Sequence, residues 1–247
     1  MKNYDKYFMK LAIKEAKKAR NEVFPNPKVG CLIVKDRKVI SKGFHKRFGG
    51  RHAEQVAIDS LPQNITKATM YITLEPCVHK GKTNPCIDLI DPSIFNRVVI
   101  SSLDPNPSAS GGIKAILNKK ISVTKNVCNL KSKKINPRFF TYHEKKRPYI
   151  IIKAALTLDG FIAEPNGLSK WITNESSRQS VHELRSSCDA ILIGNKTAIT
   201  DNPSLDSHGK GKDPIPVIID PSKSLNKRLK IFKKNPIVFS SDVLKSK

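Results

Sequence analysis

The sequence predicts an α/β protein of two domains. Segments rich in β-branched residues alternate with segments whose apolar residues recur at helical spacing, which favours sheets covered by helices. A polar, basic stretch over residues 125–147, just before Pro148, separates two such patterns. The chain of 247 residues is long enough for two domains with separate cores. We therefore expect domains at residues 1–146 and 147–247, with a linker near residue 147.

The first domain opens with an amphipathic helix, because apolar residues recur at helical spacing over residues 3–21. Asn26-Pro27 then marks a turn, and two strands, at 29–34 and 38–43, flank the turn at Asp36-Arg37. The elements expected after them are a helix from His52, a strand at 68–73, a helix after Cys86, a strand at 97–101, a helix at 112–118 and a strand at 121–124.

Residues 52–86 contain a candidate metal site. His52, Cys77 and Cys86 offer one imidazole and two thiolates, the kind of ligands that a tetrahedral Zn²⁺ accepts when its fourth position is left for water. A proline precedes each cysteine, which predicts that each cysteine opens a helical turn whose N-terminus stabilises a thiolate. We expect the His52 and Cys77 segments to meet at the edge of the sheet where strands pass into helices.

Glu54, two residues after His52, is the candidate proton carrier. A carboxylate there can accept a proton from water that the metal activates and pass it to a leaving amine. The pattern H-x-E followed by P-C-x(n)-C is typical of zinc deaminases that act on cytosine or adenine rings. Two alternatives stay open: a structural zinc with His79 or His45 as fourth ligand, and cysteines that are only small buried hydrophobes.

Composition and charge exclude several classes of protein. No apolar run is long enough to cross a bilayer and no signal peptide is recognisable, so we expect a cytoplasmic protein without membrane association. The odd number of five cysteines does not suggest a disulfide scaffold, and Cys31, Cys128 and Cys188 should be reduced. The net charge of +24 is compatible with nucleic-acid binding. The lysines are dispersed, however, which favours a solvated surface that attracts phosphorylated ligands.

The first domain resembles a known family. The motifs that carry the resemblance are Pro25-Asn26-Pro27-Lys28-Val29-Gly30-Cys31, Gly43-Phe44-His45, His52-Ala53-Glu54, the block from Thr73 to Cys86, and Asp104-Pro105-Asn106-Pro107. They are similar, in this order, to those of the cytidine-deaminase-like domain of the bifunctional riboflavin-biosynthesis deaminase-reductase. Transfer-RNA deaminases and most free-base deaminases have C-x-x-C where this chain has eight residues between Cys77 and Cys86.

The resemblance implies a three-layer α/β/α fold and zinc-dependent deamination of 2,5-diamino-6-(5-phosphoribosylamino)pyrimidin-4-one. Family positions that contact the pyrimidine or its ribose phosphate fall on Asn26, His45, His79, Lys82 and Thr83, and a loop that closes on the substrate falls on Asp104 and Asn106. Asn-Pro and Asp-Pro are also ordinary turn formers. The family's G-x-G after this loop is read here as Ser110-Gly111-Gly112, one residue shorter.

The second domain begins with the β-branched run at 149–153, which predicts a buried strand. A helix at 175–187 and a strand at 190–194 follow. The segments 153–160 and 169–173, together with these elements, resemble the start of the same family's reductase domain, which has a dihydrofolate-reductase-like α/β fold and uses NADPH. The resemblance implies substrate contacts at Lys153, Ser169, Arg185 and Leu205, and NADPH contacts at Ala155, Trp171, Thr197 and Asp201.

The second domain departs from the family in two ways. His208 stands where the family has an arginine, and the chain ends roughly a hundred residues short of the family's length, which predicts an incomplete reductase domain. We expect one Zn²⁺ per deaminase site, NADPH only if the second domain is functional, a phosphoribosyl pyrimidine as substrate, and a homo-oligomer. The alternatives are a nucleic-acid deaminase of the transfer-RNA type and a deaminase whose second domain is structural.

Overall fold

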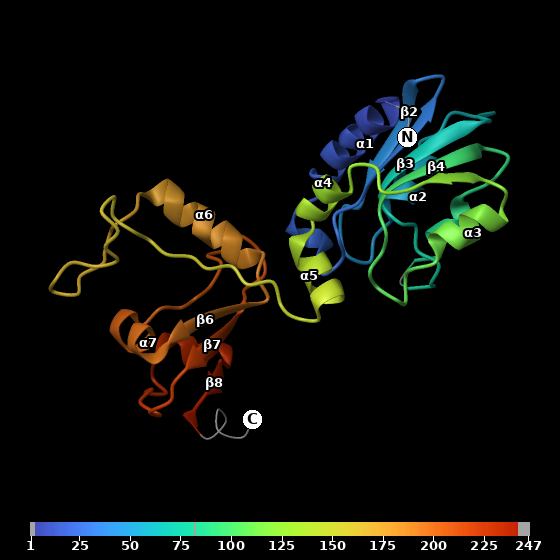
Figure 1. Cartoon of the computed structure of the whole chain (residues 1–247). Coiled ribbons are helices and arrows are strands. Elements are labelled where there is room, and N and C mark those ends of the chain that lie inside the picture. Colours follow the sequence, from blue (N-terminus) through green and yellow to red (C-terminus); the bar gives the residue numbers. More distant parts are fainter. Residues whose placement is uncertain (1–2, 82, 242–247) are drawn as a thin grey trace. The chain divides into compact units, whose positions relative to one another are not determined.

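The computed structural model describes residues 3–81 and 83–241. The chain forms two compact units, Met1–Ile151 and Ile152–Lys247, each built around its own sheet (Figure 1). The α/β class predicted from the alternating pattern is therefore confirmed. The functional boundary expected after residue 146 stays a prediction.

The first unit contains a mixed sheet with the strand order β2-β1-β3-β4-β5. β1 pairs antiparallel with β2 and β3, whereas β3, β4 and β5 run parallel. Since parallel strands end at the same edge, the residues that follow β3 and β4 lie close together, as is usual for sites in α/β proteins. The strands are β1 Gly30–Lys35, β2 Lys38–Phe44, β3 Ala68–Leu74, β4 Phe95–Ser102 and β5 Ser122–Thr124.

Helices cover both faces of this sheet, which gives three layers (Figure 1). Alternate strand residues point to opposite faces. Leu32 and Tyr71 pack against α1, whereas Ile33 and Met70 belong to a second core that α2 and α3 cover. The helices of this unit are α1 Asn3–Ala16, α2 Ala53–Asp59, α3 Gly112–Asn118, α4 Asn129–Lys134 and α5 Pro137–Lys145, with short 3-10 helices η1 Asn21–Val23 and η2 Cys86–Leu89.

A glycine in β2 allows α2 to approach the sheet closely. A Cβ atom at Gly43 would lie 2.5 Å from the carbonyl oxygen of Ala53, in the first turn of the helix. No side chain fits at that distance, so glycine at this position is what brings the start of α2 down onto the strand. His52 immediately precedes α2 and Glu54 lies in its first turn, so the contact positions both residues.

The stretch over residues 125–147, which is polar and basic in sequence, is folded as part of the first unit. α4 and α5 lie within it, and Ser132 donates a hydrogen bond of 2.7 Å to the carbonyl oxygen of Thr73. Pro137 is the first residue of α5. Proline is tolerated there because its missing N–H would have no partner within the helix.

Two helices expected in the first unit are shorter than predicted, and the helical turn expected at Cys77 does not form. α1 ends at Ala16, after which Lys18 and Ala19 form hydrogen bonds to residues three positions earlier. Cys86 opens only the four-residue η2, since Pro92 soon follows and disfavours a helix before it. No helix starts at Cys77, because the N–H of Val78 donates to the carbonyl oxygen of Ala109 (3.4 Å) in another loop.

The second unit contains a parallel sheet with the order β6-β7-β8 in its described part. Its core includes Ala198, Leu205, Ile218 and Ile231, which are all buried. Asn174 caps the first helix by accepting the N–H of Ser177 at 2.9 Å. The elements are α6 Glu175–Ser186, β6 Ala190–Gly194, α7 Asn195–Asp201, β7 Ile215–Ile219, η3 Lys230–Lys234 and β8 Ile237–Phe239.

The buried strand expected at 149–153 is wrong. The segment has no strand assignment, and the side chains of Ile150 and Ile152 are 68% and 92% exposed. A strand requires a hydrogen-bonded neighbour, and the sheet formed by the described residues of this unit contains only β6, β7 and β8. No helix among residues 3–81 and 83–241 combines the length and apolar character required of a membrane span.

Candidate metal centre and adjoining cavity

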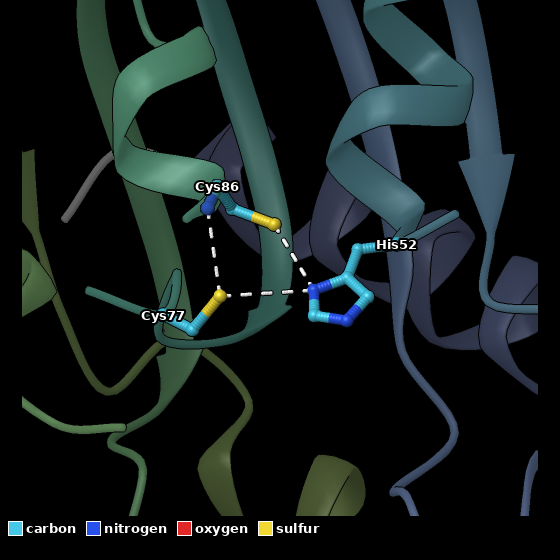
Figure 2. Close-up of side chains that lie close together, drawn as sticks. All are labelled: His52, Cys77 and Cys86. Carbon is cyan, nitrogen blue, oxygen red and sulfur yellow. Dashed lines mark hydrogen bonds between the residues drawn. The ribbon is translucent and has the colours of Figure 1, made fainter. Parts of the chain in front are cut away.

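Three potential metal ligands from separate segments meet at the carboxyl end of β3. His52 immediately precedes α2, Cys77 follows β3, and Cys86 begins η2. His52 Nδ1 lies 3.1 Å from Cys86 Sγ and 3.7 Å from Cys77 Sγ, and all three ligand atoms lie within 4.8 Å of one another (Figure 2). The structure therefore brings together the three residues predicted from the sequence.

The geometry of this cluster fits zinc. A tetrahedral centre with Zn–S bonds of about 2.3 Å and Zn–N bonds of about 2.0 Å separates its nitrogen and sulfur ligands by roughly 3.5 Å. The two measured separations lie on either side of that value. The group contains neither His45 nor His79 among the described residues, so a fourth protein ligand of the kind that a structural zinc requires is not in place.

Hydrogen bonds within the cluster favour a thiolate at Cys77. A hydrogen bond from the Cys86 thiol lowers the pKa of Cys77 to about 4, and the backbone N–H of Cys86 also donates to Cys77 Sγ at 3.4 Å. The same bond raises the pKa of Cys86, which keeps its proton. A hydrogen bond to Cys77 raises the pKa of His52. Thiolates are the metal-binding form of cysteine, so Cys77 is in the form that binds a metal ion.

Glu54 lies in the first turn of α2 and is 4% exposed. Its burial raises the pKa of the carboxyl to about 7, although the nearby His52 opposes this shift. A carboxyl group with a pKa near neutrality can both accept and release a proton. Glu54 and His52 both line the adjoining cavity.

A cavity of about 290 Å³ adjoins the metal cluster. The residues that line it come from the loops before β1 and α2, the ends of β3 and β4, and α5. Of the residues predicted from the sequence, those on the cavity wall are Asn26, His45, His52, Glu54, Cys77, His79, Thr83, Asp104 and Asn106. Cys86 is buried within the cluster, and Lys82 lies outside the described residues.

Asn26 and His45 form a pair whose orientation can be deduced. His45 Nδ1 lies 2.9 Å from the carbonyl oxygen of Arg51, which can only accept, so Nδ1 carries the proton. Burial lowers the pKa of His45, so the ring is neutral and Nε2 is an acceptor. The Asn26 Nδ2 group therefore donates to Nε2 at 3.2 Å, which leaves the Asn26 carbonyl oxygen available to accept a hydrogen bond.

Asp104 and Asn106 belong to the loop that follows β4. The N–H of Asn106 donates to Asp104 Oδ1 at 2.8 Å, and the N–H of Ser108 donates to Asn106 Oδ1 at 3.2 Å. Both side chains thus form the turns expected of Asp-Pro and Asn-Pro, and both also line the cavity. Burial raises the pKa of Asp104 to about 6.

The backbone explains why Gly111 and Gly112, at the end of the shortened loop, are both glycine. Gly111 has φ +107°, a left-handed conformation that favours glycine, and it caps the N-terminus of α3. A Cβ at Gly112 would lie 2.2 Å from the carbonyl oxygen of Pro76. The start of α3 is therefore in close contact with the segment that precedes Cys77.

Sequence reasoning missed several cavity residues, among them Phe48, Glu75 and Phe139. Phe48 precedes Gly49-Gly50, a loop signal next to the His52 motif. Glu75 lies between a buried strand and the first cysteine, and a charged residue at such a position indicates a specific polar contact. Phe139 lies on α5, and Pro137 at the first helical position would have revealed this helix.

The residues predicted for the second domain lie before α6, on α6, on α7 and just after α7. Lys153, Ala155, Ser169 and Trp171 precede α6, and Trp171 is 71% exposed, with the Arg178 guanidinium 4.3 Å from the centre of its ring. Of the remaining four, Arg185 lies on α6, Thr197 and Asp201 lie on α7, and Leu205 is buried. The Nη1 group of Arg185 donates a hydrogen bond of 3.2 Å to the carbonyl oxygen of Asp206.

His208, at which the resemblance led us to expect an arginine, lies close to an acidic side chain. Its Nε2 is 2.9 Å from Asp206 Oδ1, and its ring lies 4.0 Å from that of His182. The imidazole therefore has a carboxylate partner within the same unit.

Comparisons with known proteins agree with this description. The zinc-binding region of cytidine and deoxycytidylate deaminases matches residues 2–102, and the RibD C-terminal domain matches residues 148–246. The riboflavin biosynthesis protein RibD of Aquifex aeolicus is 43% identical over 224 residues, which are 90% of this chain and 63% of that protein. RibD of Escherichia coli is 36% identical over 228 residues, 92% of this chain and 62% of that protein.

Two solved structures are similar over nearly the whole chain. A diaminohydroxyphosphoribosylaminopyrimidine deaminase/5-amino-6-(5-phosphoribosylamino)uracil reductase from Thermotoga maritima has 43% identity and a TM-score of 0.83, covering 96% of this chain and 69% of that one. RibD of Acinetobacter baumannii has 34% identity and a TM-score of 0.85, covering 98% and 71%.

The fold of the first unit and its His-Cys-Cys cluster define a protein of the zinc-deaminase class. More narrowly, the chain belongs to the RibD family of riboflavin-biosynthesis deaminase-reductases. It spans about three fifths of the length of the curated relatives that it matches. These relatives do not favour the nucleic-acid alternative considered from the charge.

Proposed function

We propose that this chain carries out the hydrolytic deamination of 2,5-diamino-6-(5-phosphoribosylamino)pyrimidin-4-one in riboflavin biosynthesis. One observation carries the proposal: the buried Glu54 lies on the wall of one cavity together with His52 and Cys77, two members of the His52-Cys77-Cys86 cluster. The Thermotoga maritima relative, 43% identical, is named as a deaminase of a compound of this class.

His52 Nδ1 and the sulfur atoms of Cys77 and Cys86 would hold the metal. When bound, Zn²⁺ would supply a Lewis acid that lowers the pKa of a water molecule to about 7. Thr83 supports the set, because its Oγ1 lies 3.4 Å from His52 Nε2 and can hold the ring in place.

Glu54 would move the proton. Its carboxylate accepts a proton from the attacking water and then donates it to the departing amine, so that one residue serves as base and as acid. The exclusion of water from the buried carboxyl strengthens its interaction with the substrate's amine.

The Asn26 amide would recognise the pyrimidine. Its carbonyl oxygen is available as an acceptor because His45 occupies the amide nitrogen. A ring N–H or amino group of the substrate is the matching donor. For the ribose phosphate we propose His79, Lys82 and Thr83, and for closure over the substrate Asp104 and Asn106.

For the second unit we propose the N-terminal part of an NADPH-dependent reductase domain, supported by the match to the RibD C-terminal domain. The substrate positions would be Lys153, Ser169, Arg185 and Leu205, and the nucleotide positions Ala155, Trp171, Thr197 and Asp201. We assign the deaminase to residues 1–146 and the reductase portion to 147–247. All five cysteines are free, and free thiols are typical of reducing compartments, which supports the proposed cytoplasmic location.

The exchange of Glu54 for glutamine tests this function. The variant Glu54→Gln keeps the size of the side chain but cannot accept a proton, so kcat should fall by at least about a hundredfold. Zinc content, measured by atomic emission, should stay at one ion per chain. As a control, Glu183→Gln removes an exposed carboxylate in the second unit and should leave kcat unchanged. Full activity of Glu54→Gln would overturn the proposed role.

A further inference from the structure

A single carboxylate connects the metal-binding segment with the loop that follows β4. Glu75 directly follows β3, is 7% exposed, and lines the cavity. Its Oε2 accepts the backbone N–H of Asp104 at 3.1 Å. Its Oε1 accepts the N–H groups of Gly111 and Ile113 at 3.2 and 3.0 Å. Glu75 therefore bonds to both ends of the segment 104–111.

The backbone around Glu75 is itself fixed. Its N–H donates to the carbonyl oxygen of Ser102 at 2.9 Å, which continues the pairing of β3 with β4. Two residues later the chain reaches Cys77, and the N–H of Val78 donates to the carbonyl oxygen of Ala109 at 3.4 Å. The carboxylate thus projects from a rigid strand end toward a loop that has no strand or helix of its own.

Apart from its bonds to Glu75 and the bond from the Val78 N–H to the Ala109 carbonyl oxygen, the hydrogen bonds of this loop among the described residues are local. Asp104 accepts from Asn106, and the carbonyl oxygen of Asn106 accepts the N–H groups of Ala109 and Ser110, both at 3.0 Å. Local turns of this kind fix the shape of a loop but not its place relative to the sheet. Among the described residues, the hydrogen bond from the Asp104 N–H to the Glu75 carboxylate is what holds the start of this loop at the cavity.

We propose that Glu75 is a positioning residue for substrate binding: its carboxylate holds the segment 104–111 so that Asp104 and Asn106 stay on the cavity wall. The inference rests on the proposed function, since the loop matters only if a ligand occupies this cavity. Glu75 contacts neither the reacting atoms nor the metal in this account. It acts through the loop.

The variant Glu75→Gln tests the contact directly. A glutamine keeps one oxygen for Gly111 and Ile113 but presents its NH₂ group, another donor, to the N–H of Asp104. Amide exchange at Asp104 should therefore become at least about tenfold faster, because a backbone N–H in a buried place has lost its acceptor. Hydrogen exchange followed by NMR measures this without substrate.

Asp36→Asn is the matched control. It makes the same change of carboxylate to carboxamide at an exposed residue in the turn between β1 and β2, where an asparagine tolerates the φ of +49°. Exchange at Asp104 should be unchanged in this variant. Glu75→Asp keeps the charge on a shorter side chain and should give an intermediate effect, and it serves as the test if Glu75→Gln does not fold.

Kinetics separate positioning from a purely structural role. In Glu75→Gln, KM should rise by about tenfold while kcat changes little and zinc content stays at one ion per chain. A fall in the fraction of active protein, with KM unchanged, would overturn the inference, as would unchanged exchange at Asp104. If the parent chain does not turn over the pyrimidinone at all, the proposed function fails, and the exchange data still decide whether Glu75 holds the loop.

Discussion

At the residue scale, Asp104 illustrates how the cavity changes the chemistry of one group. Burial raises the pKa of its carboxyl to about 6 in the folded chain, compared with about 3.9 in an unfolded chain. Between these pH values the folded state keeps a proton that the unfolded state releases. The contribution of Asp104 to the free energy of unfolding therefore falls as the pH rises from about 4 to about 6.

The variant Asp104→Asn should remove this pH dependence. Asparagine cannot ionise, and its Oδ1 can still accept the N–H of Asn106. Relative to the parent, the variant should gain stability as the pH rises from about 4 to about 6 and keep the gain above that range. Urea unfolding at several pH values, with a chelator present, measures the difference. A constant difference across this range would contradict the raised pKa.

The metal ligands were predictable from the sequence because their chemistry is specific to residue type. Few other roles require one histidine and two proline-preceded cysteines near a His-x-Glu pair, and the predicted cluster matches the observed one. Glu75 was not predictable in this way. Its role depends on the backbone N–H groups of residues about 30 to 40 positions later in the chain. Every residue but proline has such a group, so the sequence does not indicate which of them a side chain will bind.

At the element scale, α1 is held to the sheet by a buried ion pair. Arg97 on β4 donates two hydrogen bonds of 2.9 Å to the fully buried Asp5 on α1, and Tyr71 donates another at 2.9 Å. Both nitrogen atoms of the guanidinium tip match both carboxylate oxygens, which is the strongest geometry for such a pair.

Arg97→Met should destabilise the first unit by about 3–5 kcal/mol, because a buried carboxylate loses its cationic partner. The control is Arg51→Met, which removes the ion pair of 2.8 Å between Arg51 and Asp59, both well exposed. That change should cost less than about 1 kcal/mol. Chemical unfolding measures both, and equal effects would contradict the importance assigned to the buried pair.

The start of the helix α5 is bound to the loop before β1 by the side chain of Asn136. Asn136 accepts the N–H of Lys28 at 2.7 Å and donates to the carbonyl oxygen of the same residue at 2.8 Å. Asn136 is 7% exposed, and Phe139, one turn later, lines the cavity. The attachment therefore links the loop containing Asn26 with the wall formed by α5.

Asn136→Ala should lower the free energy of unfolding by about 1–3 kcal/mol, since two partly buried backbone groups of Lys28 lose their partners. KM should also rise, because Phe139 is no longer held at the cavity. The exposed Asn118 at the end of α3 provides the control, and Asn118→Ala should change stability by less than about 0.5 kcal/mol. An unchanged KM in Asn136→Ala would show that α5 is not part of the binding wall.

Elements with a regular pattern were predicted well, and elements defined by their partners were not. The helix at 112–118 and the strand at 190–194 occur with the bounds expected. The apolar run at 149–153 carries a strong strand pattern, but a pattern cannot supply the hydrogen-bonded neighbour that a strand needs. α4 and α5 were missed because their sequence is basic and polar, and their place in the fold depends on buried contacts of Ser132 and Asn136.

At the scale of the whole molecule, all the proposed deaminase residues that the structure describes fall within the first unit. A chain of residues 1–151 should therefore fold, bind one zinc ion and keep kcat for deamination within about threefold of the full chain. Metal analysis and steady-state kinetics test this. A folded fragment that binds zinc but has lost deamination would mean that the second unit contributes to the first reaction.

The central claim is that this chain replaces a pyrimidine amine with oxygen at the His52-Cys77-Cys86 cluster. Mass spectrometry of the product formed from 2,5-diamino-6-(5-phosphoribosylamino)pyrimidin-4-one by the zinc-loaded chain, with and without NADPH, tests it most directly. The account predicts loss of one amine and gain of one carbonyl oxygen in both cases, with two further hydrogen atoms only where NADPH is present and the second unit is functional. Unchanged substrate with a fully zinc-loaded chain would contradict it.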